Sequence, residues 1–323
     1  MSATEKRATF SLASIYGLRM LGLFLIMPVF ALYAEELAGV TPLLVGLAIG
    51  IYGLTQALLQ IPFGMLSDRI GRKPVIVGGL ILFAIGSIVA AMSESITGVI
   101  LGRALQGSGA IAAAVMALVA DSTRESNRTK AMALIGISIG MAFMIALVAG
   151  PLLYKSISVP GMFWMTAVLA VAGIVVILFV VPTPEQSTIH RDAEVVSGQV
   201  GRVLHNIELL RLDFGIFVLH LIMTALFLAY PLLLRDMGGI ASEDHWTVYL
   251  PVLVLSIMLM VPFIIFAERK GKTKQVFLLA ITALSVGLFG IGELASSKWG
   301  LVGRLLLFFV AFNLLEASLP SLI

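Results

Sequence analysis

The chain has 323 residues, of which 59% are hydrophobic and 12% are charged, and its formal net charge is +3. A soluble domain carries about 25% charged residues, so this composition excludes a water-covered globular protein and predicts an all-α polytopic membrane protein. The basic residues stand in short loops rather than in one patch, which excludes a nucleic-acid-binding protein. The sequence contains no cysteine, which excludes disulfides and thiolate metal sites.

Apolar runs of the length needed to cross a bilayer, about 20 residues, recur along the whole chain. Several contain a proline, which neighbouring helices tolerate and which we expect to kink the helix locally. The ten predicted spans are 10–34, 43–66, 74–93, 97–120, 131–154, 161–182, 212–234, 246–267, 275–295 and 299–319.

Lysine and arginine fall unevenly on the two sides of these spans. With the N-terminus on the cytoplasmic side, the inner segments hold 15 of these residues and the outer loops hold 3. Because cytoplasmic loops are enriched in Lys and Arg, the sequence predicts a cytoplasmic N-terminus.

The segment from Gly64 to Lys73 organises the chain, because it places one acid and three bases between two apolar runs. We expect it to form a tight turn at the membrane surface. A similar pattern returns 200 residues later, which we interpret as an internal repeat. The matched segments are Ile61–Phe63 with Val261–Phe263, Asp68–Arg69 with Glu268–Arg269, and Gly71–Arg72 with Gly271–Lys272.

The repeat predicts three parts of the chain. These are an N-terminal six-helix bundle over 1–182, a cytoplasmic linker over 183–211, and a C-terminal bundle of about four helices over 212–323. The linker becomes amphipathic around 203–210, which predicts a short interfacial helix, with a flexible tether as the alternative. Counterparts of the fifth and sixth helices would fall beyond residue 323, so we expect a truncated chain with about ten of twelve helices.

Two motifs resemble signatures of the major facilitator superfamily. The segment from Gly64 to Lys73 reads G-M-L-S-D-R-I-G-R-K and resembles the family's signature between its second and third helices. Arg103, Gln106, Gly107 and Gly109 resemble the R-x-x-Q-G-x-G-A pattern of its drug:proton antiporter branch. The resemblance implies the major facilitator fold, two six-helix bundles related by a pseudo-twofold repeat, in a bacterial inner membrane.

The resemblance also implies a gate at the charged turn. Asp68, Arg72 and Asp121 would form a charge cluster that latches the two halves together on the cytoplasmic side. Simpler explanations are that Asp68 starts a helix, where the dipole favours an acid, and that the bases follow the positive-inside rule. The expected loop residues are Gly64, Asp68, Arg69, Gly71, Arg72 and Asp121 in the first repeat, and Glu268, Arg269, Gly271 and Lys272 in the second.

Polar side chains inside the predicted spans are candidates for proton coupling and the substrate cavity, because ionisable groups are costly in a bilayer. By resemblance, Arg103 would couple protons to substrate; the alternative is a structural arginine bonded to carbonyl groups of the first helix. Glu316 or His220 could carry the proton, and the alternatives are a glutamate in water and a structural histidine. The complete set is Arg19, Arg103, Gln106, His220, Asn313 and Glu316.

The sequence predicts neither an enzyme nor a cofactor, since it has no metal-ligand spacing among its histidines and no phosphate-binding loop. We expect a monomeric secondary transporter that works by alternating access and exports small amphiphilic compounds, with protons as the coupling ion. An uptake or sugar-efflux permease and an inactive fragment are the alternatives.

Overall fold

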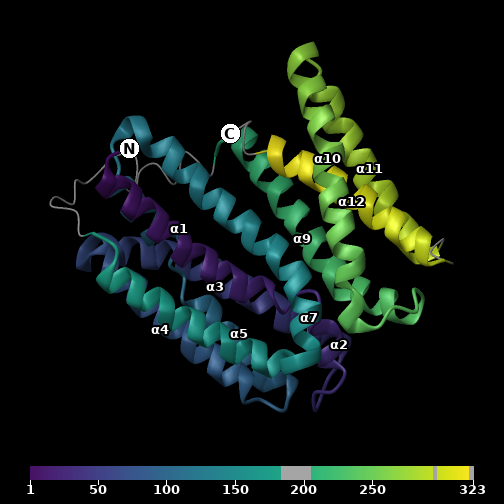
Figure 1. The fold of residues 1–323 in the computed structure, drawn as a ribbon, viewed down its shortest axis with the longest axis horizontal. Helices are drawn as coiled ribbons and strands as arrows, with labels where there is room; N and C mark the ends of the chain where they lie inside the picture. The colour runs from purple at the N-terminus through teal and green to yellow at the C-terminus, as the bar shows by residue number, and fades with distance from the viewer. Residues whose placement is uncertain (183–204, 294–296, 320–323) are drawn as a thin grey trace. The chain divides into compact units, whose positions relative to one another are not determined.

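The computed structural model describes residues 1–182, 205–293 and 297–319 (Figure 1). Contacts divide the chain into two compact units, Met1–Val195 and Val196–Ile323. The described elements are helices, apart from one isolated bridge between Ala38 and Ser95. The all-α prediction is therefore confirmed for this part of the chain.

The first unit contains seven helices in its described residues. In chain order they are α1 (Ala3–Phe24), α2 (Phe30–Ala34), α3 (Pro42–Ile70), α4 (Arg72–Ala91), α5 (Ile96–Ser108), α6 (Ala112–Asp121) and α7 (Glu125–Phe179). Helix α1 packs along α7, while α4 and α3 both pack against α5.

The second unit contains four α-helices and one 3₁₀ turn in its described residues. They are α9 (Ile207–Asp236), η1 (Ser242–Asp244), α10 (Trp246–Lys270), α11 (Thr273–Glu293) and α12 (Lys298–Ser318). Helix α12 packs against α10 and α11. Of the predicted linker, residues 207–211 are the first turns of α9, and residues 183–204 lie outside the described part.

Side chains at the helix starts satisfy backbone N–H groups that have no partner within the helix. Ser2 and Glu5 form a reciprocal capping box at the start of α1. Thr41 caps α3, whose first residue is Pro42. Three further caps are Ser95 for α5, Asn206 for α9 and Ser297 for α12.

Every predicted span coincides with helix in its described residues, and two spans contain breaks. The first span is divided into α1 and α2 around Pro28, which agrees with the expected kink. The span 97–120 is divided into α5 and α6 by residues 109–111. The spans 131–154 and 161–182 form the two halves of α7, joined at Ser158, whose φ is 54°.

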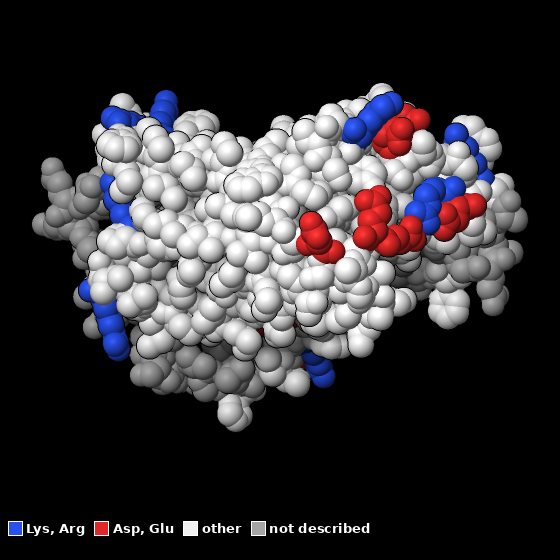
Figure 2. All heavy atoms as spheres, turned by 90° about the horizontal axis from the view of Figure 1, so that it is seen from below, with Lys and Arg blue, Asp and Glu red and all other residues white. Residues whose placement is uncertain are grey.

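The surface is that of a protein in lipid. Seven helices of the described part are long and apolar enough to cross a membrane. Large apolar side chains lie open, including Phe289 at 90%, Trp299 at 77% and Phe179 at 76% exposed. Figure 2 shows one face on which a broad area carries no charged side chain. The protein is therefore a multi-pass membrane protein.

Glycine lets helices of the first unit approach closely. A Cβ atom at Gly86 of α4 would lie 2.4 Å from the backbone nitrogen of Gln106 in α5. A Cβ atom at Gly102 of α5 would lie 2.6 Å from the backbone nitrogen of Ala90 in α4. Small residues commonly allow such contacts between membrane helices. The spacing of Gly136 and Gly140 in α7 suggests another close contact between helices. A Cβ atom added to either residue, however, would have nothing within 4 Å.

Candidate functional site

The charged segment is a helix end rather than the loop that the sequence predicts. Helix α3 continues through Asp68 to Ile70, and Gly71 alone separates it from α4. Gly71 has a φ of 98°, a conformation that favours glycine. The prediction that Asp68 starts a helix is wrong, because it lies in the last turn of α3, where the helix dipole disfavours an acid.

A charge cluster offsets the unfavourable position of Asp68 in the last turn of α3. The guanidinium of Arg72 donates to Asp68, to Ser67 Oγ at 2.7 Å and, through Nε, to Asp121 Oδ2 at 3.4 Å. The Asp121 side chain is 4% exposed and that of Asp68 is 36% exposed. The structure therefore brings together three residues from α3, α4 and α6 that the resemblance assigns to a gate.

The other two loop residues of the first repeat lie beside this cluster. Arg69 is exposed at the end of α3. Gly64 lies within α3, and a Cβ added to it would approach the Cβ of Ala113 in α6 to 3.2 Å. Gly64 therefore allows α3 to pack closely against the helix that ends in Asp121.

Glu5 forms a second clamp next to the cluster, which sequence reasoning missed. Its Oε1 accepts from the Arg124 backbone N–H at 2.9 Å and from Arg124 Nε at 3.1 Å. The Asn127 amide also donates to it, at 3.3 Å to Oε2. Arg124 occupies the N-cap position of α7 only three residues after Asp121, so Glu5 ties the start of α1 to the turn that follows Asp121. The sequence pattern Ser2-x-x-Glu5, which is typical of a capping box, could have drawn attention to Glu5.

The Glu5 clamp predicts a pH dependence of stability. The Arg124 guanidinium, aided by backbone N–H groups of Arg124 and Ser2, holds the pKa of Glu5 well below its usual 4.5. The stabilisation is present above the unfolded-state pKa and is lost as pH falls below it. We expect Glu5→Gln to lower the unfolding temperature at pH 7, and the gap from wild type to narrow as pH falls below about 4.5.

Thermal unfolding between about pH 7 and pH 3.5 checks this. Glu208→Gln is the control, because the side chain of Glu208 is 74% exposed and pairs with the neighbouring Arg211. A gap between wild type and Glu5→Gln that stays constant over the whole range would contradict the prediction.

Arg103 lies in a buried polar network. It is 2% exposed, its Nη1 donates to Gln106 Oε1 at 2.9 Å, and Gln106 Nε2 donates to Ser87 Oγ at 2.7 Å. Its Nε donates to the carbonyl oxygen of Ala48 at 3.3 Å. The alternative of bonds to the first helix is wrong, because Ala48 belongs to α3.

Arg19 is buried in the same unit, with 1% of its surface exposed. Its Nη2 donates to Gln56 Oε1 and to the Gly109 carbonyl oxygen, both at 3.1 Å. The guanidinium carbon lies 5.6 Å from the ring centre of Tyr52, and that of Arg103 lies 4.8 Å from the same ring. Two membrane arginines therefore share one aromatic side chain.

In the second unit, the structure pairs two residues that the sequence offers as separate proton carriers. His220 Nε2 of α9 lies 3.8 Å from Glu316 Oε2 of α12, and the two side chains are 47% and 45% exposed. His220 is therefore not buried within its unit. Asn313, one turn before Glu316, donates to Ser256 Oγ of α10 at 3.0 Å.

The second repeat keeps the turn but not the charge cluster. Gly271 ends α10 with a φ of 60°, matching the positive φ of Gly71. Glu268 and Arg269 are exposed, and no ion pair joins Glu268 to another described residue. Lys272 Nζ lies 5.7 Å from the ring centre of Phe266. The position of Ser67 is taken by Ala267, which has no hydroxyl.

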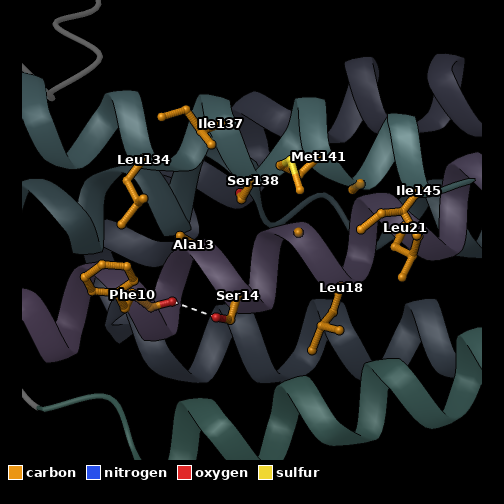
Figure 3. A pocket seen from close by; sticks show the side chains of 12 residues that line it. Phe10, Ala13, Ser14, Leu18, Leu21, Leu134, Ile137, Ser138, Met141 and Ile145 are labelled. Carbon is orange, nitrogen blue, oxygen red and sulfur yellow. Dashed lines mark hydrogen bonds between the residues drawn. The ribbon is translucent and has the colours of Figure 1, made fainter. Parts of the chain in front are cut away.

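An apolar groove of about 370 Å³ runs between α1 and α7 (Figure 3). Phe10, Leu18 and Leu21 line it from α1, and Met141 and Ile145 line it from α7. The hydroxyl of Ser14 donates to the Phe10 carbonyl oxygen of its own helix. The groove therefore offers mainly apolar surface.

Buried arginines, a charge cluster at a helix end and seven apolar spans in the described part define a multi-pass helical membrane protein. The family model described as Major Facilitator Superfamily matches residues 12–323, and the chain belongs to that family. The family consists of secondary transporters, so the chain is not an enzyme.

Two relatives and one solved structure illustrate the similarity. The inner membrane transport protein YajR of Escherichia coli (strain K12) is 52% identical over 323 residues, covering 100% of this chain and 71% of that protein. The multidrug resistance protein MdtH of Aeromonas hydrophila subsp. hydrophila is 25% identical over 309 residues, covering 94% and 75%. A bacterial homolog of the human lysosomal transporter Spinster, crystallised inward-facing and unoccupied, superposes with a TM-score of 0.71 at 16% identity, covering 99% and 76%. This last likeness concerns the fold alone.

Proposed function

We propose that the protein is a proton-coupled exporter of small amphiphilic compounds, working as a monomer by alternating access in the inner membrane, with a cytoplasmic N-terminus. The observation that carries proton coupling is the pair of His220 and Glu316, two titratable groups 3.8 Å apart on membrane helices. A carboxylate is stable in water when charged and enters a closed apolar site more easily when protonated. Glu316 is therefore the proposed proton carrier and His220 its partner.

Two further observations support the class of substrate. The groove between α1 and α7 offers apolar surface to one part of an amphiphile. The relative MdtH is named a multidrug resistance protein, and YajR an inner membrane transport protein. In the proposed cycle, the cluster of Asp68, Arg72 and Asp121 latches the cytoplasmic side, and Arg103 links substrate binding to the proton.

Counterflow in liposomes tests the proposal. We expect the reconstituted protein to move ethidium or 1-naphthoate faster when a pH gradient is imposed. Glu316→Gln should remove the effect of the gradient, because an amide cannot carry the proton. Asp213→Asn is the control, since it removes an exposed acid from α9 of the same unit.

Transport of xylose without either amphiphile would favour a sugar permease instead. A pH dependence that survives Glu316→Gln would exclude Glu316 as the carrier.

A further inference from the structure

The break between α5 and α6 creates a helix start inside a predicted span. Helix α6 begins at Ala112 after Ile111, and no side chain caps it. The start of a helix carries partial positive charge and backbone N–H groups, and attracts anions. Transporters with interrupted helices place such starts next to anionic substrate groups.

Arg19 reaches this break from α1. Its Nη2 donates to the carbonyl oxygen of Gly109, the residue at which α5 ends. Although Arg19 is 1% exposed, its Nε and Nη1 have no hydrogen-bond partner among the described residues. The hydroxyl of Tyr52, whose ring lies beside this guanidinium, is also buried and has no partner in the described part of the chain. Buried polar groups are almost always satisfied in folded proteins, and unsatisfied ones point to a missing water or ion.

The surrounding charge is positive and unbalanced. Arg103 lies against the Tyr52 ring together with Arg19. The ion pairs of Asp68, Asp121 and Glu5 involve Arg72 and Arg124, and none of these pairs involves Arg19 or Arg103. Two buried guanidinium groups without a counter-ion are costly in a membrane, and an anion would offset that cost.

We propose that Arg19, Tyr52, Gln56 and the break at 109–111, together the broken-helix site, bind the anionic group of the transported compound. A carboxylate, sulfonate or phosphate monoester fits, because each accepts several charge-assisted hydrogen bonds from one guanidinium. Gln56 is half-buried and holds Arg19 through its side-chain oxygen. The anion displaces this amide oxygen and gains the free Nε and Nη1 groups. This inference rests on the proposed export of amphiphiles and narrows their class to anionic ones.

Equilibrium binding to the purified protein in a non-ionic detergent tests the site. The probes are 1-naphthoate, 1-naphthylmethanol and 1-naphthylmethylammonium, which share one hydrophobic ring system and differ in charge. We expect naphthoate to bind about ten-fold or more tightly than the alcohol, because hydrogen bonds to a charged group are the strong ones. The ammonium compound should bind more weakly than the alcohol.

Variants locate the binding. Arg19→Gln should remove the preference for naphthoate and leave binding of the alcohol unchanged. Tyr52→Phe should weaken naphthoate binding by a few-fold at most, since it removes one neutral hydrogen bond. Arg19→Lys keeps the charge but lacks the Nε and Nη1 groups, so it should weaken naphthoate binding and leave binding of the alcohol unchanged, and it locates the site if Arg19→Gln does not fold. The control is Arg304→Gln, which removes a guanidinium from α12 of the other unit.

Equal binding of naphthoate and the alcohol would overturn the inference, as would equal losses in the variants of Arg19 and Arg304. Binding is measured without any gradient. Hence a missing charge preference with intact gradient-driven counterflow of 1-naphthoate removes the broken-helix site alone, whereas loss of that counterflow removes the proposed function.

Discussion

Asp68→Asn is expected to abolish transport while leaving the protein inserted in the membrane. The substitution keeps the size of the side chain but removes one of the two acids around Arg72. The proposed latch then loses the charge balance that holds the ends of α3, α4 and α6 together. We expect gradient-driven counterflow to fall about ten-fold or more, since charge-assisted bonds are the strong ones.

Stability should change much less than transport. Because the Asp68 side chain is 36% exposed, its pair with Arg72 is screened by water, and we expect a loss below about 1 kcal/mol. Asp121→Asn should lower the unfolding temperature further, since the Asp121 side chain is only 4% exposed. Glu125→Gln is the matched control, an exposed acid on the next helix. Wild-type counterflow in Asp68→Asn would exclude the gate.

Hydropathy predicts which residues lie in lipid, but it does not predict where each helix begins and ends. An apolar run records where the chain lies in lipid, whereas a helix ends where its backbone hydrogen bonds stop. The run before the charged segment is predicted to end at residue 66, yet α3 continues to Ile70, because only Gly71 turns the backbone. The charged residues thus lie on a helix that projects beyond the apolar span.

For the same reason, hydropathy does not predict the break between α5 and α6. Residues 109–111 are Gly-Ala-Ile, which reads as part of an apolar helix. The break depends on tertiary packing, since a Cβ at Gly109 would lie 2.2 Å from the Gly79 carbonyl oxygen of α4. The pairing of His220 with Glu316 could not be predicted from the sequence either. The two residues lie on different helices, and a pattern within one helix does not show how two helices pack.

The internal repeat can be recognised in the sequence because its two copies share backbone turns that favour glycine. Each of the glycines with positive φ in the described residues has a counterpart 200 positions away: Gly39 with Gly239, and Gly71 with Gly271. Turn positions that only glycine tolerates well keep their residue, whereas polar contacts around them are free to diverge. The charge cluster at Arg72 and its absence around Lys272 are consistent with this difference.

Gly107→Ala is expected to disrupt the first unit. A Cβ at Gly107 would lie 2.1 Å from Thr55 Oγ1 and 2.2 Å from the carbonyl oxygen of Tyr52. The second atom belongs to the backbone of α3, so no side-chain rotation relieves the clash. Helices α3 and α5 must separate, and overpacking of this kind costs about 3 kcal/mol or more at the upper end of its usual range.

The same separation would break the buried network. Arg103 of α5 donates to the Ala48 carbonyl oxygen of α3 across this interface. We therefore expect the unfolding temperature to fall by about 5–10 °C, together with a loss of counterflow. The control is Gly78→Ala in α4, where an added Cβ meets nothing within 4 Å. That change should be neutral or stabilise by up to about 1 kcal/mol, because alanine favours helix over glycine. Equal unfolding temperatures for the two variants would contradict close contact between α3 and α5, and with it the placement of Arg103.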